Sequence, residues 1–425
     1  MRFAVVNLGC KVNAYETEGV ARKLEAAGFE RVEWEEPAEI TVIFTCAVTN
    51  TAAAKSRKMI HRARRKHPEG IVAVAGCYAQ IDPDALEDAD ILVGSKHKTQ
   101  LAEYIQQAVR DHKRIVDVSD LKDAAFEPLP VDHFSGRTRA FLKIQDGCNQ
   151  FCSYCVIPYA RGHERSMDPA MVVEEAKKIS ASHKEIVLTG IHTGRYGREY
   201  GITLTDLLKR ILTEIPALER LRISSIEVTE LDEAFLDLFE SEPRIARHLH
   251  IPLQAGSDEV LRRMKRPYTT EDYYNKVCEI RSRVPDVSIS ADLMTGFPSE
   301  TDELFASSLE FIRQCKLSFL HVFPFSVRNG TAATGMKDQI DVAVRKERAR
   351  TCIALSEELY DAYKDSMIHK PVEVLLETET TGHTSEYLEV TMAQPGIPGT
   401  IIPAVIEKRV GHDLFAQGKE QYETE

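Results

Sequence analysis

The 425-residue sequence lacks any long hydrophobic run. No apolar stretch approaches the roughly 18 residues that a membrane-spanning helix requires, which argues against an integral helical membrane protein. The start, Met1 to Asn7, also lacks the charged, apolar and small-residue regions of a secretory signal peptide. We therefore expect a cytoplasmic protein that does not associate with a membrane.

An excess of positive charge is absent as well. Lys and Arg number 54 against 66 Asp and Glu, which gives a formal net charge of -12. Because nucleic-acid binding depends on positive charge near the phosphates, an RNA partner would have to meet a local basic patch.

Hydrophobic periodicity predicts an α/β fold of three domains. Strand patterns alternate with helical ones, such as Glu16 to Ala27 closed by Gly28, and indicate an open α/β sheet in residues 1–118; the expected strands are 3–6, 41–44, 71–75 and 91–93. The stretch from Val118 to Arg137 contains Pro and Gly and has no sustained hydrophobic periodicity. We therefore expect residues 119–137 to be a linker.

The alternation restarts after Arg139. About six βα units in residues 138–368 predict a parallel partial (βα)6 barrel with its ligands at the carboxyl ends of the strands; these are expected at 141–144, 185–189, 222–225, 248–251, 288–292 and 319–323, with a helix at 342–365. Residues 369–425 change to short β-rich runs, interrupted by Gly and Pro, and predict a small β-barrel; the runs are 372–377, 387–391 and 400–410.

Three of the nine cysteines lie close together just after the first expected barrel strand. Cys148, Cys152 and Cys155 are separated by three and then two residues. Thiolates bind iron-sulfur clusters or zinc, and three from one loop can hold three irons of a 4Fe-4S cluster, which leaves the fourth iron open to an external chelator. Structural zinc completed by a distant His, or buried unmetallated cysteines, are the alternatives.

This motif, with Tyr154 before its last cysteine, resembles that of the radical S-adenosylmethionine (SAM) superfamily. The resemblance implies that the amino and carboxylate groups of SAM chelate the open iron. It also implies that an electron, delivered by reduced flavodoxin or ferredoxin, cleaves SAM to a 5'-deoxyadenosyl radical.

A second set of cysteines follows three strands of the N-terminal sheet. Cys10, Cys46 and Cys77 each come after the carboxyl end of an expected strand, where side chains of neighbouring strands converge. A single cysteine is more often a small buried hydrophobe, but the shared position of these three favours a second, auxiliary 4Fe-4S cluster.

Together, the cysteine-bearing N-terminal domain, radical barrel and C-terminal TRAM-like β-barrel resemble the radical SAM methylthiotransferases along the whole chain. Leu8 to Glu16 is most similar to the MtaB branch, and the resemblance implies conversion of N6-threonylcarbamoyladenosine, at position 37 of the tRNA anticodon stem-loop, to its 2-methylthio derivative. Isopentenyladenosine in tRNA or a ribosomal-protein aspartate is the alternative substrate. A zinc-stabilised RNA-binding protein is the non-enzymatic alternative.

The same resemblance implies cofactor-binding residues near the cysteine loop and at strand ends. Gly190 permits close backbone approach to SAM. The expected set is Tyr154, Thr189, Gly190, His192, Gln254, Ser257, Asp292 and Arg165. Arg161 and Arg165 can bind a SAM carboxylate or an RNA phosphate, with exposed surface charges as the alternative. Met167 stands where the family often has Arg, which puts the role of a second Arg in doubt.

A basic run on an expected helix, Lys55 to His67, supplies the local positive patch. The alternative is a helix face that only contacts solvent. The run has almost no acidic residues to offset its positive charge, however, and this favours contact with RNA phosphates through Lys55, Arg57, Lys58, Arg62, Arg64 and Arg65. The C-terminal segment is acidic, so RNA contact there would need Lys408 and Arg409 or stacking by Phe415.

Overall fold

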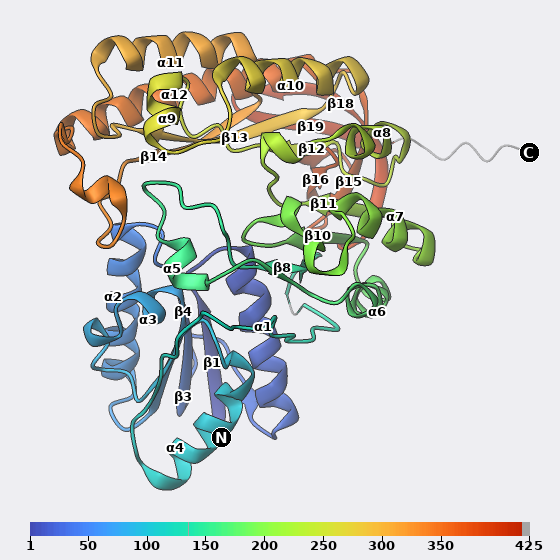
Figure 1. Cartoon of the computed structure of the whole chain (residues 1–425). Helices are drawn as coiled ribbons and strands as arrows, with labels where there is room; N and C mark the ends of the chain where they lie inside the picture. The colour runs from blue at the N-terminus through green and yellow to red at the C-terminus, as the bar shows by residue number, and fades with distance from the viewer. Residues whose placement is uncertain (135, 419–425) are drawn as a thin grey trace, which may run out of the picture.

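The computed structural model describes residues 1–134 and 136–418, and Figure 1 shows the N-terminal domain below a larger barrel. The N-terminal domain contains a six-stranded parallel sheet in the order β2-β1-β3-β4-β5-β6. Its strands are β1 (Arg2–Asn7), β2 (Glu30–Arg31), β3 (Ile40–Thr45), β4 (Ile71–Gly76), β5 (Ile91–Val93) and β6 (Ile115–Asp117).

Helices cover both faces of this sheet because its central strands are apolar on both sides. In β3, Val42 and Phe44 pack with α1 (Lys11–Ala26) and α4 (Leu101–Asp111), whereas Ile43 packs with α2 (Asn50–Lys66) and α3 (Cys77–Ile81). The alternation follows from the two-residue period of a strand. The N-terminal domain is therefore a three-layer α/β/α sandwich.

Six parallel strands form the central partial barrel: β7 (Arg139–Lys143), β10 (Glu185–Thr189), β11 (Arg220–Ile223), β12 (His248–His250), β13 (Ser288–Thr295) and β14 (Phe319–Pro324). They make two three-stranded sheets that meet where Leu221 bridges Ile245, just before β12. The outer helices are α6 (Pro169–Ser180), α7 (Leu204–Glu214), α8 (Glu233–Ser241), α9 (Asp258–Arg263), α10 (Thr270–Arg283), α11 (Asp302–Cys315) and α12 (Val342–Ser366).

A closed five-stranded barrel follows α12, with the strand order β15-β16-β17-β19-β18. Its strands are β15 (Pro371–Leu376), β16 (Thr381–Thr384), β17 (Glu389–Met392), β18 (Ile401–Val410) and β19 (Asp413–Gly418). It is docked on the central barrel by buried arginines: Arg222 pairs with Glu185 at 2.7 Å and donates to the Ser385 carbonyl oxygen at 3.0 Å. Residues 419–425, which we assigned to this domain, lie outside the described part.

The mixed α/β architecture and the C-terminal β-barrel confirm the predicted fold class, with differences at element ends. Helix α1 begins at Lys11, five residues before the expected Glu16, directly after the Cys10 loop. The strand expected from Tyr387 begins only at Glu389, because Tyr387 has a φ of 69° and lies in a turn. The short strands β2, β6, β16 and β19 were not expected individually. No helix in the described ranges is both long and apolar enough to cross a membrane.

Candidate active site

The two ends of the Cys148 loop are held together by a pair of short strands. Strands β8 (Gln145–Asp146) and β9 (Arg165–Ser166) pair antiparallel, with the loop and the short helix α5 (Ile157–Arg161) between them. Gly147 has a φ of 71°, and a Cβ there would lie 1.9 Å from the His163 carbonyl oxygen. Cys148 also donates its backbone N–H to the Gly162 carbonyl oxygen at 3.0 Å. Only glycine fits at position 147, so the approach to the first cysteine is fixed.

The three thiols of this loop form a donor set suited to a metal cluster. Burial raises the pKa of Cys155 to about 12, and the neighbouring Cys152 and Cys148 add to the shift. A proton held this firmly has to be displaced by a metal before the thiolate forms. Burial also raises the pKa of Cys152, and Arg266, which donates to Cys152 Sγ at 3.3 Å, opposes that shift. Of the six other cysteines, three belong to neither expected cluster site and lie on outer helices: Cys278, Cys315 and Cys352.

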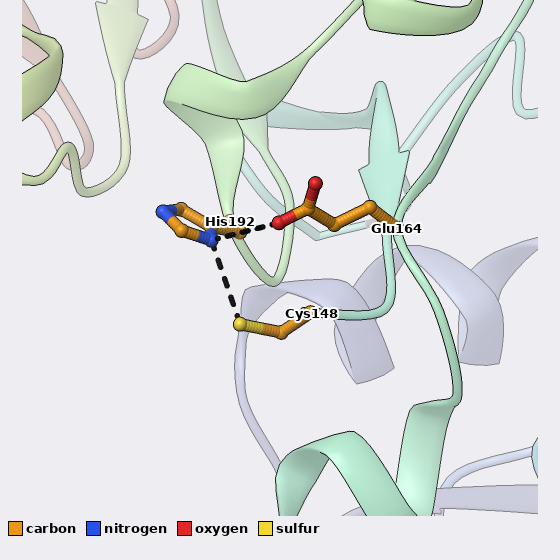
Figure 2. Close-up of side chains that lie close together, drawn as sticks. All are labelled: Cys148, Glu164 and His192. Atoms are coloured by element: carbon orange, nitrogen blue, oxygen red, sulfur yellow. Dashed lines mark hydrogen bonds and ion pairs between the residues drawn. The ribbon is translucent and has the colours of Figure 1, made fainter. Parts of the chain in front are cut away.

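His192 lies beside the first cysteine of the loop, as Figure 2 shows. Its Nδ1 is 3.4 Å from Cys148 Sγ and 3.4 Å from Glu164 Oε1, and its Nε2 is 2.7 Å from Glu230 Oε1. Burial lowers the pKa of His192, but hydrogen bonds to Cys148, Glu164 and Glu230 outweigh it and raise the value to about 12. Cys148, Glu164 and His192 offer ligand atoms within 4.8 Å of one another. This group contains neither Cys152 nor Cys155, so it is not the three-thiol site completed by a histidine that the zinc alternative expects.

The N-terminal cysteines come together because their strands are neighbours. Cys10 is the N-cap of α1 after β1, Cys46 directly follows β3, and Cys77 directly follows β4. Burial raises the pKa of Cys46 to about 11, and the nearby Cys77 and Cys10 contribute to the shift. The arrangement gives three thiols at one edge of a sheet, which fits the expected second cluster.

A buried ionic cluster connects the two cysteine sites. Arg161, at the end of α5, donates Nε–H to Cys77 Sγ at 3.1 Å and Nη1–H to Glu16 Oε1 at 2.7 Å. Lys143 pairs with the same Glu16 oxygen at 2.8 Å and with Asp146 Oδ2 at 2.9 Å. All four charged residues are at most 1% exposed. Opposing charges hold the pKa of Glu16 at about 2 despite the raising effect of burial, mainly through Arg161 and then Lys143. No pattern in the sequence predicts this cluster.

The expected cofactor residues are distributed over three cavities. Tyr154, Gln254 and Asp292 line a cavity of about 170 Å³ together with Cys155. Thr189 and Gly190 line a larger one, of about 590 Å³, together with Cys10. His192 lines a third of about 550 Å³. The structure thus brings cysteine ligands of both sites to cavities that contain expected cofactor residues.

Ser257 and Arg165 line none of these three cavities. Ser257 is buried at the N-cap of α9. The Arg165 guanidinium donates to Asp146 Oδ2 at 3.1 Å and to the carbonyl oxygens of Arg161 and His163. Arg161 and Arg165 are both buried, so the surface-charge alternative is wrong for them. A direct SAM contact by Ser257 or Arg165 stays a prediction.

The expected RNA-binding residues lie on α2 but differ in their availability. Lys55, Lys58, Arg62 and Arg65 are exposed, and their spacing places them along one side of the helix. Arg57 donates to the Tyr78 hydroxyl and Arg64 pairs with Asp90. The exposed stripe is therefore the part of the run free to meet phosphates.

Comparison with known proteins identifies the family. Residues 2–94 match "Uncharacterized protein family UPF0004", and residues 142–312 match the radical SAM superfamily. A Bacillus subtilis protein named threonylcarbamoyladenosine tRNA methylthiotransferase MtaB is 42% identical over 90% of this chain and 88% of its own length. The chain belongs to the radical SAM methylthiotransferase family. Radical SAM membership implies a 4Fe-4S cluster and SAM.

Other members of this methylthiotransferase family are also similar along most of their length. An Aquifex aeolicus MtaB is 35% identical over 92% of this chain and 96% of its own. A Caldicellulosiruptor saccharolyticus tRNA-2-methylthio-N(6)-dimethylallyladenosine synthase is 32% identical over 88% of this chain and 82% of its own. Among solved structures, the radical SAM methyltransferase TsrM from Kitasatospora setae has a TM-score of 0.56 at 18% identity, covering 76% of this chain and 72% of TsrM. That likeness shows the fold alone.

Proposed function

We propose that this enzyme converts N6-threonylcarbamoyladenosine at position 37 of the tRNA anticodon stem-loop to its 2-methylthio derivative. The observation that carries the proposal is the 42% identity to a protein named for this substrate, along nearly the full length of both chains. The relative named for dimethylallyladenosine is 32% identical. The segment Leu8 to Glu16 predicts the MtaB branch, and the more similar of these two relatives is named MtaB.

The residues of each cysteine site have separate tasks in this proposal. Cys148, Cys152 and Cys155 hold the radical SAM cluster, which with bound SAM supplies a radical able to remove hydrogen from the adenine C2 carbon. Cys10, Cys46 and Cys77 hold the auxiliary cluster and serve sulfur insertion. Arg266 and Arg161 each donate to one cysteine sulfur, and hydrogen bonds to ligand sulfurs tune cluster potentials.

The remaining expectations are part of the same proposal. We assign residues 1–118 to the methylthiotransferase domain, 138–368 to the radical barrel and 369–425 to a TRAM-like domain, with 119–137 as the linker. The cofactor-binding candidates that line cavities with Cys10 or Cys155 are Tyr154, Thr189, Gly190, Gln254 and Asp292. Reduced flavodoxin or ferredoxin delivers the electron, and a tRNA substrate places the enzyme in the cytoplasm.

The test combines a gene deletion with cysteine variants. Mass spectrometry of tRNA nucleosides from cells lacking this chain should show loss of the 2-methylthio derivative and accumulation of N6-threonylcarbamoyladenosine. In vitro, Cys152→Ala should abolish 5'-deoxyadenosine formation, whereas Cys46→Ala should retain it and lose methylthiolation. Cys352→Ala, at a buried cysteine on α12, is the matched control. An unchanged nucleoside profile in the deletion strain would reject the tRNA substrate.

A further inference from the structure

The large cavity of about 590 Å³ contains a cation without an anionic partner. Lys11 directly follows Cys10, lines this cavity and is exposed to it. Among residues 1–134 and 136–418 its ammonium forms no hydrogen bond and no ion pair. Glu389 also lines the cavity but does not pair with Lys11.

Nearby guanidiniums differ from Lys11 in this respect. Arg139 pairs with Glu377 at 2.7 Å, and Arg222 pairs with Glu185 at 2.7 Å. Both stack on Tyr387, a cavity-lining residue, at 5.1 and 4.9 Å from its ring centroid. Their charges are thus compensated, while that of Lys11 is available to a ligand.

Two buried polar atoms on the cavity wall also lack a partner in the described ranges. Ser224 Oγ and His248 Nδ1 are buried without a hydrogen bond, and each residue is 8% exposed. His248 uses its other nitrogen, Nε2, toward Ser290 Oγ at 2.9 Å. An unsatisfied buried polar atom costs about 1–3 kcal/mol, so these atoms favour a ligand that bonds to them.

Two of the histidines that line the cavity, His248 and His321, do not replace Lys11 as its positive charge. The other two, His250 and His383, lie beside the carboxylates of Asp292 and Glu377. Burial lowers the pKa of His248 and of His321, so both rings are neutral at neutral pH. A cavity with one unpaired ammonium and unsatisfied polar atoms suits an anionic, hydrogen-bonding group. An unbranched or branched hydrocarbon substituent would leave all of them unsatisfied.

We propose that Lys11 binds the carboxylate of the N6-threonylcarbamoyl group, with Ser224 and His248 bonding to the polar remainder of that side chain. This inference rests on the proposed function and adds the basis of its substrate choice. In adenine, C2 and the carbon bearing N6 flank the same ring nitrogen, N1. A nucleoside whose N6 side chain meets Lys11 therefore directs the same edge, with its reacting C2, toward the adjacent Cys10 site.

The first arm of the test uses the unmodified full-length enzyme with both clusters. Binding of anticodon stem-loop RNA carrying N6-threonylcarbamoyladenosine is compared with that of the same RNA in which the carboxylate is a methyl ester. Loss of a charge-assisted hydrogen bond predicts about 10- to 100-fold weaker binding of the ester. Equal affinity for the two RNAs would overturn the inference, while methylthiolation of the acid would leave the proposed function standing.

The second arm uses variants of Lys11. Lys11→Gln should bind the acid and the ester with equal affinity, whereas Lys11→Arg should keep the preference for the acid. Iron content reports whether the Cys10 site still binds its cluster. SAM also has a carboxylate, so its dissociation constant is measured in parallel and should not change. If Lys11→Gln weakened SAM binding and kept the acid-to-ester preference, the subsite would belong to SAM and the inference would be wrong.

Discussion

Arg161 donates Nε–H to Cys77 Sγ at 3.1 Å, so a side chain from the radical SAM loop contacts a cysteine of the N-terminal site. Arg161 ends α5, which begins two residues after Cys155. The two cysteine sites are therefore joined by one short segment of chain and one hydrogen bond. Any shift of α5 alters both sites together.

Replacing this guanidinium should destabilise the enzyme strongly. Arg161→Met leaves the buried Glu16 and Asp146 without one of their cations, and breaking such a buried pair costs about 3–5 kcal/mol. Thermal unfolding should show a clearly lower Tm, with a smaller loss for Arg161→Lys. Arg65→Met on the exposed side of α2 is the control and should leave the Tm unchanged. An unchanged Tm in Arg161→Met would contradict the importance of the cluster.

Gly147→Ala should disrupt the cysteine loop. The added Cβ would meet the His163 carbonyl oxygen at 1.9 Å, which forces the backbone before Cys148 to move. We expect little iron in the Cys148 site, measured by iron analysis and by the absorbance of the reconstituted protein. Gly201→Ala is matched, because Gly201 has a φ of 67° but no neighbouring atom within 4 Å. It should cost only about 1–2 kcal/mol and retain iron. Full iron binding by Gly147→Ala would show that the loop tolerates the shift.

Stability should fall as pH rises toward neutrality because of Glu175 on α6. Its Oε1 accepts hydrogen bonds from the Tyr15 hydroxyl at 2.8 Å and from the Val131 N–H at 3.0 Å. Burial raises the pKa of Glu175 from 4.5 to about 7. Below pH 4.5 the carboxyl of Glu175 is protonated in both the folded and the unfolded chain. Between 4.5 and 7 the unfolded chain ionises first, so about 3 kcal/mol of stability is lost by the time the pH passes 7.

Glu175→Gln removes this titration and keeps a hydrogen-bond acceptor. The Tm of Glu175→Gln minus the Tm of the unmodified enzyme should become larger as the pH is raised from 5 to 8. Glu174→Gln changes the neighbouring exposed carboxylate and should show no such trend. A constant difference between Glu175→Gln and the unmodified enzyme across this range would exclude the titration of Glu175.

The exposed stripe on α2 should contribute to tRNA affinity through phosphate contacts. Each contact contributes about 0.7–0.9 to the slope of log affinity against log salt. Changing Lys55, Lys58, Arg62 and Arg65 to Gln should therefore weaken binding and reduce the slope by about 3. Arg110→Gln with Lys113→Gln, exposed cations at the end of α4, is the control and should leave the slope unchanged. An unchanged slope in the α2 variant would mean that the stripe is a solvated face.

Much of this arrangement could be predicted from the sequence because strand ends in a parallel sheet are positioned by topology. The places of Cys10, Cys46 and Cys77 after β1, β3 and β4 follow from apolar runs alone. The contact between Arg161 and Glu16 could not be foreseen, because it joins residues 145 apart across two domains. Burial of an arginine depends on its partners, and the helical pattern around Glu16 predicts only a helix.

The buried cluster of Glu16, Lys143, Asp146 and Arg161 restricts which domains can be exchanged between related proteins. Glu16 comes from the N-terminal domain, and the other three come from the barrel. A hybrid that takes its first domain from a distant relative inherits one side of this set without the other. The proposed linker, residues 119–137, is a joining point in the sequence, yet a hybrid made there keeps only Lys98 as a cationic partner of Glu16 unless Lys143 and Arg161 are inherited with the acid.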